Sequence, residues 1–234
     1  MVKFKKTKSA INDLLQVMAA LRSPEGCPWD REQDHMSLRF HAVEEVYELI
    51  DAIELADDAE MREELGDLLL QVVFHCQLAR ERGAFDFEKV AREMTEKLLR
   101  RHPHVFGDSQ AKTVDAVWAQ WDQIKKAEKQ GTHRERTSAF DGIPKHLPAL
   151  MRAEKLVKKA RKAKFLDEDN SKTNRKSEKA VGEELYRLAQ YAQSKGWSAE
   201  ELLRRELKRR EREWRQAEAK SIKPGHERRT KSRK

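Results

Sequence analysis

Residues 64–78 read Glu-Leu-Gly-Asp-Leu-Leu-Leu-Gln-Val-Val-Phe-His-Cys-Gln-Leu, and this stretch decides the fold. Apolar side chains would cover most of the circumference of a helix with this sequence, and a helix of that kind is buried on most sides. The polar residues that are left form one stripe, at spacings of three, four and four, made of Glu64, Asp67, Gln71 and His75. The stretch therefore predicts a core helix that carries acids along one face.

A second amphipathic helix is expected just before it, from about Phe40 to Ala56. Asp57-Asp58 then forms a short turn, and the core helix runs from about Ala59 to Arg82. Helices joined by so short a connection lie antiparallel as neighbours. Residues three apart share a helix face, so we expect two carboxylate pairs to meet across this interface: Glu45 with Glu48, and Glu64 with Asp67.

The rest of the chain also shows helical spacing and no strand pattern. Gly (9) and Pro (6) are scarce for 234 residues, which argues against a β-sandwich or barrel. The segment around residues 23–35, with two prolines and a glycine, is expected to be a loop. The predicted fold class is all-α, an antiparallel helical bundle with a second helical part. Further helices are expected over residues 9–21, 86–101, 113–129, 148–163, 178–195 and 198–220.

The two parts of the chain differ in charge. Residues 1–130 hold 19 Lys/Arg and 25 Asp/Glu, a net charge of −6, whereas residues 131–234 hold 30 and 16, a net charge of +14. We expect a first domain over residues 1–130, a linker over 131–147, a basic helical part over 148–220 and a disordered basic tail over 221–234. The basic part suits nucleic acid or another polyanion, or it is a set of solvated helix faces.

Membrane and export signals are lacking. The longest nearly apolar run, Leu68–Phe74, is interrupted by Gln71 and is too short to span a bilayer. The polar N-terminus has no signal-peptide core. Two cysteines, Cys27 and Cys76, are too few for a disulfide scaffold. These features predict a cytoplasmic protein with no membrane partner.

Acids crowded on a buried stripe would repel one another, lose hydration and take up protons unless a cation were present. Carboxylate-only ligands favour Mg²⁺ or Mn²⁺ over Zn²⁺. One alternative is a solvated acidic stripe. Another is a di-iron bundle, which needs two Glu-x-x-His motifs, and the chain has one, Glu32–His35.

Four segments in order resemble the MazG-type nucleoside triphosphate pyrophosphohydrolases. Glu44-Glu45-x-x-Glu48 followed by Glu64-x-x-Asp67 is similar to the family's metal-binding signature. The other three segments are residues 26–33 (Gly-Cys-Pro-Trp-Asp-Arg-Glu-Gln), 64–74, and 100–106 (Arg-Arg-His-Pro-His-Val-Phe). The likeness covers about residues 9–130.

The resemblance implies an all-α enzyme, built as an oligomer of dimers, that cleaves nucleoside triphosphates to the monophosphate and pyrophosphate in nucleotide house-cleaning. Glu45, Glu48, Glu64 and Asp67 would hold Mg²⁺, with Mn²⁺ as a substitute. Glu44 would sit beside them, supporting the ligands or binding a further ion. Glu44, Glu45 and Glu48 are the catalytic candidates, and Glu45 or Glu48 would take the proton.

Substrate contacts are expected from cations and an aromatic side chain. Lys97 and Arg101 are four apart on one helix face, and the resemblance places them at phosphate-binding positions; alternatively they are a solvated helix end. Trp29 offers a π-face to a nucleobase, or it anchors the loop. Gln71 is a further pocket candidate, and His35, His75 and Arg100 are weaker ones.

The second part resembles a degenerate copy of the first. Residues 180–189 are similar to the Glu-Glu-Leu-Gly-Asp stretch, but Tyr186 stands in place of the glycine and Arg187 in place of the ligand aspartate. A cation there cannot bind Mg²⁺, so we expect this part to serve packing or dimerisation. The competing hypothesis for the whole chain is a helical module that binds nucleic acid or protein through this basic half.

Overall fold

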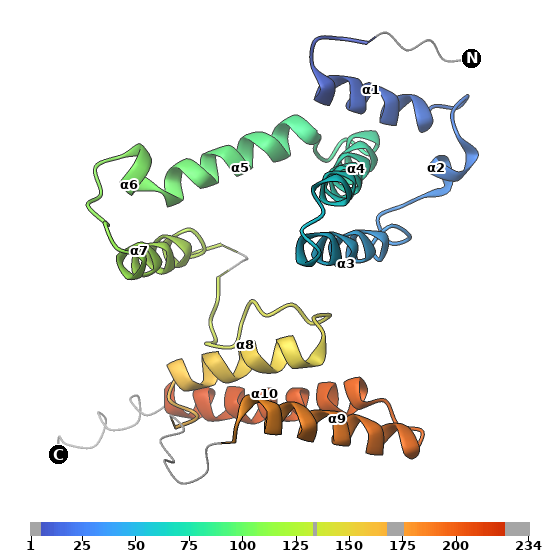
Figure 1. Cartoon of the computed structure of the whole chain (residues 1–234). Helices are drawn as coiled ribbons and strands as arrows, with labels where there is room; N and C mark the ends of the chain where they lie inside the picture. Colours follow the sequence, from blue (N-terminus) through green and yellow to red (C-terminus); the bar gives the residue numbers. More distant parts are fainter. Residues whose placement is uncertain (1–5, 133–134, 168–175, 223–234) are drawn as a thin grey trace, which may run out of the picture. The chain divides into compact units, whose positions relative to one another are not determined.

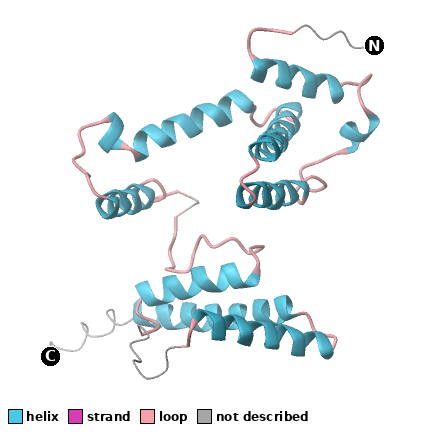
Figure 2. Ribbon diagram, viewed as in Figure 1, coloured by secondary structure: helices cyan, strands magenta, loops and turns pink. Residues whose placement is uncertain are grey.

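The computed structural model describes residues 6–132, 135–167 and 176–222, and within them every regular element is a helix (Figures 1 and 2). The prediction of an all-α fold is thereby confirmed. No helix in the described ranges has both the length and the apolar character that a membrane crossing requires. The helices are α1 (Ala10–Leu21), α2 (Pro28–Glu32), α3 (His41–Glu54), α4 (Asp58–Glu81), α5 (Phe87–Arg101), α6 (Pro103–Phe106), α7 (Val114–Ala127), α8 (Ala149–Lys162), α9 (Glu178–Ser194) and α10 (Ala199–Ile222).

The chain divides into two compact units, which we call unit 1 (residues 1–121) and unit 2 (residues 122–234). The division falls within α7, ahead of the boundary expected at residue 130. Helix α10 includes the first two residues of the expected tail, 221 and 222. The rest of that tail lies outside the described residues.

Short side chains fix where the helices of unit 1 begin. The side chain of Ser9 accepts a hydrogen bond from the backbone N–H of Asn12 at the start of α1. Asp57 caps α4 and Asp86 caps α5 in the same way, with N···O distances of 2.9 Å to Ala59 and 2.9 Å to Lys89. Such caps satisfy N–H groups that have no partner inside the helix.

Two short helices lie where loops were expected. Helix α2 begins at Pro28 and α6 begins at Pro103, so the prediction of a loop throughout residues 23–35 was wrong for residues 28–32. Proline at the first helical position already has a helical φ and lacks an N–H that would be unpaired there. The same residue type that marks a break in the sequence therefore also starts a helical turn.

Unit 1 has its core between α1, α4 and the loop before α3. Its buried members are Met18, Leu38, Val73, Phe74 and Leu78.

The opposite side of α4 is open, because Leu65, Leu69 and Val72 are 52%, 40% and 43% exposed. The expectation that α4 is buried on most sides was therefore wrong for a single chain. This apolar face of α4 could be buried only by a surface from outside unit 1 as it stands here.

Arg22 fastens the α2 segment to the core. Its Nε and Nη2 donate to the two carboxylate oxygens of Glu81, each at 2.7 Å. Its Nη1 donates to the carbonyl oxygens of Asp30 and Gln33, and its guanidinium carbon lies 5.6 Å from the centre of the Phe74 ring. One side chain thus joins the end of α1, the middle and C-terminal end of α2, and the end of α4.

Unit 2 has its own core, formed chiefly where α8 packs against α10 (Figure 1). Its buried members are Phe140, Ala149, Leu156, Ala160 and Leu207. The Phe140 ring stacks on Trp214 with centroids 5.5 Å apart. Helix α9 packs more lightly on α10 and leaves Leu185, Leu188 and Tyr191 exposed.

Candidate metal centre

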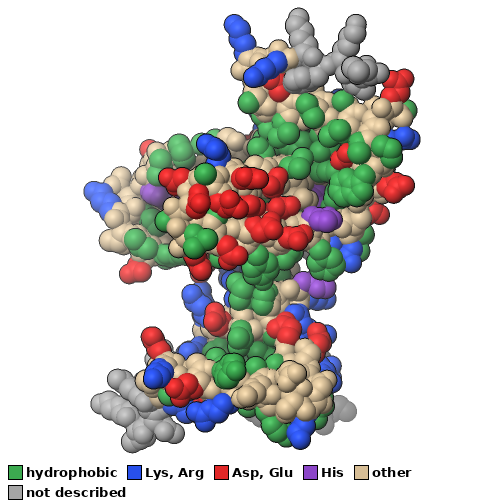
Figure 3. Space-filling model, turned by 45° about the vertical axis from the view of Figure 1, so that its right-hand side comes forward, with side chains coloured by type: hydrophobic (Ala, Val, Ile, Leu, Met, Phe, Trp, Pro, Cys, Tyr) green, Lys and Arg blue, Asp and Glu red, His purple; other side chains and the backbone are tan. Residues whose placement is uncertain are grey.

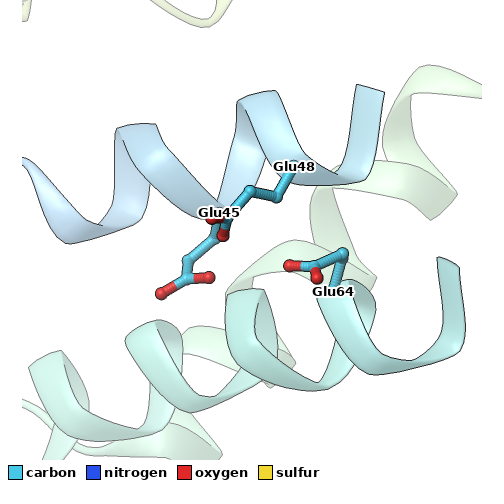
Figure 4. Close-up of side chains that lie close together, drawn as sticks. All are labelled: Glu45, Glu48 and Glu64. Atoms are coloured by element: carbon cyan, nitrogen blue, oxygen red, sulfur yellow. The ribbon is translucent and has the colours of Figure 1, made fainter. Parts of the chain in front are cut away.

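Three carboxylates from two neighbouring helices converge in unit 1. Glu45 and Glu48 on α3 and Glu64 on α4 each offer an oxygen, and these oxygens lie within 4.8 Å of one another. Figure 4 shows the three side chains directed into the space between the two helices. The turn of residues 55–57 holds α3 and α4 side by side, and the three-residue spacing of Glu45 and Glu48 turns both toward α4.

The cluster carries uncompensated negative charge. Glu64 is 7% exposed, and its Oε2 has no hydrogen-bond partner among the described residues. Burial raises the pKa of Glu64, and the charges of Glu48 and Asp67 raise it further. Burial also raises the pKa of Glu45, with Asp67 and Glu48 again contributing. Such a site favours a proton or a cation, and acidic side chains gather over this face of unit 1 (Figure 3).

Asp67 and Glu44 lie outside this closest group. Asp67 is half-buried on α4 and near enough for its charge to act on Glu45 and Glu64. Glu44 is exposed, and its Oε2 lies 3.7 Å from Nδ1 of His41. The structure therefore turns Glu44 toward a histidine of its own helix.

The polar stripe of α4 continues beyond the acids as predicted from its spacing. Gln71 is buried, and its Nε2 donates to Oε1 of Glu45 at 3.5 Å. One turn further, Nδ1 of His75 lies 2.8 Å from Nδ1 of His35, with the two rings stacked. Burial lowers the pKa of His75, and the nearby His35 lowers it further. The sequence analysis considered His35 and His75 as separate pocket candidates. Their contact joins residues that are too far apart in sequence for helical spacing to predict it.

The expected substrate-binding residues lie on helices other than α3 and α4, except for Gln71. Trp29 is 54% exposed, with its ring edge-on to His41 at 6.4 Å between centroids. Lys97 and Arg101 are half-buried on α5, which runs from α4 toward α6 (Figure 1). Lys97 lies about 15 Å along the axis from the start of that helix, at 1.5 Å per residue.

The three converging residues fit a hard divalent cation. Every donor atom is a carboxylate oxygen, the ligand type of Mg²⁺ and Mn²⁺. An ion held by these three side chains would neutralise the negative charge that they bring together within 4.8 Å. The unpartnered Oε2 of Glu64 is the kind of atom that such an ion satisfies.

Helix α9 of unit 2 presents no comparable group. In the described ranges, the cluster on α3 and α4 is the one place where three such side chains could share an ion. Tyr186 is 68% exposed, and Arg187 lies 3.6 Å from Glu183 on its own helix.

The fold and this site define an all-α protein with a carboxylate cluster between two adjoining helices. Residues 33–106 match the family model of the MazG nucleotide pyrophosphohydrolase domain. Residues 33–106 are therefore similar to a MazG domain, and the resemblance drawn from the motifs is confirmed. All four expected metal ligands lie inside the matched residues.

Curated relatives agree with this assignment. The chain is 48% identical over 156 residues to a nucleoside triphosphate pyrophosphohydrolase of Escherichia coli K12, covering 66% of this chain and 59% of the relative. It is 50% identical over 153 residues to the nucleoside triphosphate pyrophosphohydrolase/pyrophosphatase MazG of Thermotoga maritima, covering 65% and 57%. A solved structure titled as a mazG-related protein from Thermotoga maritima matches with 25% identity and a TM-score of 0.43, covering 49% of this chain and 98% of that one. The chain spans about three fifths of the length of the two curated relatives.

Proposed function

We propose that unit 1 hydrolyses nucleoside triphosphates to the monophosphate and pyrophosphate, with Mg²⁺ held by Glu45, Glu48, Glu64 and Asp67. The observation that carries the proposal is the convergence of three carboxylates within 4.8 Å from α3 and α4. The names of the curated relatives, nucleoside triphosphate pyrophosphohydrolases, support the reaction. Nucleotide pools are cytoplasmic, so we place the reaction there.

The reaction breaks the bond between the α- and β-phosphates. A water molecule attacks the α-phosphorus, its oxygen stays on the nucleoside monophosphate, and pyrophosphate leaves. Mg²⁺, or Mn²⁺ in its place, would neutralise the triphosphate and favour deprotonation of the water. Glu45 or Glu48 would accept the water's proton, and the donor Nε2 of Gln71 holds one oxygen of Glu45 in orientation. Glu44 would support the ligands from the exposed side of α3.

Substrate binding would draw on cations of α5 and on the aromatic ring of Trp29 on α2. Lys97 and Arg101 would bind phosphate oxygens, and Trp29, exposed beside α3, would stack on the base. A substrate with about four negative charges needs such cations beside the acids, because phosphoryl transfer depends on charge neutralisation.

A second copy of the chain is the expected cover for the open apolar faces of unit 1. Helix α3 exposes Val46, Ile50 and Ile53, and α4 exposes Leu65 and Leu69, each by 40% or more. Exposed apolar side chains on two neighbouring helices are typical of an interaction site. We expect light scattering after gel filtration to give at least twice the 27.4 kDa of one chain; a monomeric mass would contradict this.

Product analysis tests the reaction. The full chain with Mg²⁺ and a panel of canonical and modified nucleoside triphosphates should release pyrophosphate and the monophosphate. Glu64→Gln and Asp67→Asn should lower the rate by more than the 10–100-fold typical of residues that only support metal ligands. Glu63→Gln is the matched control, because Glu63 is exposed on the same helix and should leave the rate unchanged. Release of orthophosphate and the diphosphate, or full activity of both ligand variants, would refute the proposal.

A further inference from the structure

A cavity in unit 2 concentrates positive charge. It has a volume of about 1130 Å³ and is lined by residues of α8, α10 and the segment 140–146. Its walls carry six Lys/Arg and three Asp/Glu side chains, so the lining is net positive by three charges with its histidine neutral. The six cations are Lys145, Arg152, Arg204, Lys208, Arg212 and Arg215.

Arg152 is the buried cation of this lining, and part of its guanidinium lacks a hydrogen-bond acceptor. The residue is 6% exposed, and its Nη2 donates to Oε2 of Glu211. Its Nε and Nη1, which together carry three N–H groups, have no hydrogen-bond partner among the described residues. A guanidinium stays charged in proteins, and leaving its donors unpaired away from water is costly. The guanidinium of Arg152 therefore lines the cavity with donors that an anionic or polar acceptor would satisfy.

The acids of the cavity are already engaged with other cations. Glu211 also accepts from Nε and Nη2 of Arg215 at 3.0 and 2.8 Å, and Asp141 accepts from Nη1 of Arg215 at 2.8 Å. Glu201 lies 3.5 Å from Arg204.

Among the described residues, Lys145, Lys208 and Arg212 make no ion pair. The net charge of the cavity is therefore available to a ligand.

We propose that this cavity binds the terminal phosphate group of a small oligophosphate. Guanidinium groups recognise phosphate through charge-assisted hydrogen bonds, and the volume is slightly above the range usual for small-ligand sites. The ligand must reach a buried side chain. A terminal phosphate can enter a cavity end-on, whereas each internal phosphate of a nucleic acid is flanked by sugars on both sides. Two sources share this chemistry: free pyrophosphate and the polyphosphate tail of a nucleotide.

Calorimetric titration of the full chain in EDTA tests the proposal. EDTA removes the divalent ions on which the proposed site of unit 1 depends, and a pair of double variants assigns the remaining binding to unit 2. We expect pyrophosphate, inorganic triphosphate and ATP to bind at one site per chain. Lys208→Gln with Arg212→Gln, both exposed positions, should weaken binding about tenfold. Lys179→Gln with Lys220→Gln removes the same charge from exposed positions outside the cavity lining and should change binding less than twofold.

The outcomes separate the two sources and the two sites. Tighter binding of ATP than of inorganic triphosphate identifies a nucleotide ligand, and equal binding identifies an inorganic oligophosphate. Glu64→Gln, which removes a ligand of unit 1, should bind pyrophosphate in EDTA as the wild type does, so a failure of hydrolysis is distinguishable from a failure of this site. Three results would overturn the proposal: no binding at millimolar ligand, equal weakening in both double variants, or binding of RNA in preference to all three small anions.

Discussion

Replacing Glu64 by glutamine tests the carboxylate cluster through stability as well as rate. Glutamine has nearly the same shape, so it removes the charge and one ligand oxygen without opening a cavity. In the wild type without metal, a buried carboxylate with a raised pKa opposes folding once it ionises, so its unfavourable effect grows as the pH rises through the raised pKa. The melting temperature of Glu64→Gln in EDTA should therefore exceed that of the wild type by a margin that widens as the pH rises from the ordinary carboxyl pKa to the raised one and is constant above it. Because the melting temperatures of the two proteins are compared at each pH, the contributions of other titrating groups, such as His75, cancel.

Added Mg²⁺ should reverse the order of the two proteins. An ion that binds only the folded state at 100 times its Kd stabilises by about 2.7 kcal/mol. For a chain of this size that corresponds to a rise in melting temperature of about 5–11 °C, at 2–4 °C per kcal/mol. The wild type should show such a rise and Glu64→Gln should lose most of it.

Differential scanning fluorimetry in EDTA and in a Mg²⁺ series at several pH values measures both effects, with Glu63→Gln as the control that should follow the wild type. An equal Mg²⁺ shift in the wild type and in Glu64→Gln would refute the assignment of Glu64 as a ligand. A margin in EDTA that narrows toward pH 8 would refute the account of its charge.

Two further predictions concern the scaffold. Arg22→Ala should lower the free energy of unfolding of unit 1 by about 2–3 kcal/mol in chemical denaturation, which is less than the loss of a fully buried ion pair because the Glu81 side chain is 35% exposed. Arg80→Ala, on the exposed side of α4, is the control. Equal losses in the two variants would contradict the stabilising role of the Arg22 contacts. Because Arg22 lowers the pKa of Glu81, the Arg22 contribution should be present at neutral pH and fade as the pH falls through that lowered pKa. Leu156→Ala should cost unit 2 about 2–5 kcal/mol because Leu156 is fully buried, and Leu150→Ala, 53% exposed, should cost under 1 kcal/mol if burial is the cause.

Much of unit 1 could be predicted from spacing along the chain. The three-residue interval between Glu45 and Glu48 and the short link before α4 are local features, and local geometry alone places these acids opposite Glu64. Asp67 falls outside the closest group although its spacing from Glu64 is equally regular. The aspartate side chain is one methylene shorter than that of glutamate. Helical periodicity predicts which face a residue lies on, but not how far its carboxylate extends from the helix.

The contacts that spacing could not predict join distant parts of the sequence. Arg22 reaches Glu81 and His35 meets His75, and neither pair follows from a periodic pattern. The exposed face of α4 shows a second limit of prediction from the sequence. Apolar residues around a helix indicate that it will be covered, but not whether the cover comes from the same chain.

The hairpin of α3 and α4 also has a consequence for the order of folding. Glu45 and Glu64 lie on consecutive helices joined by a short turn. The contact that assembles the site therefore joins residues that are close in sequence for a tertiary contact. Closing a short loop costs little entropy and is fast compared with long-range docking. With Mg²⁺ bound as proposed, a nascent chain could bind the ion as soon as these two helices had emerged, and the bound ion would then stabilise an early nucleus for the helices that follow.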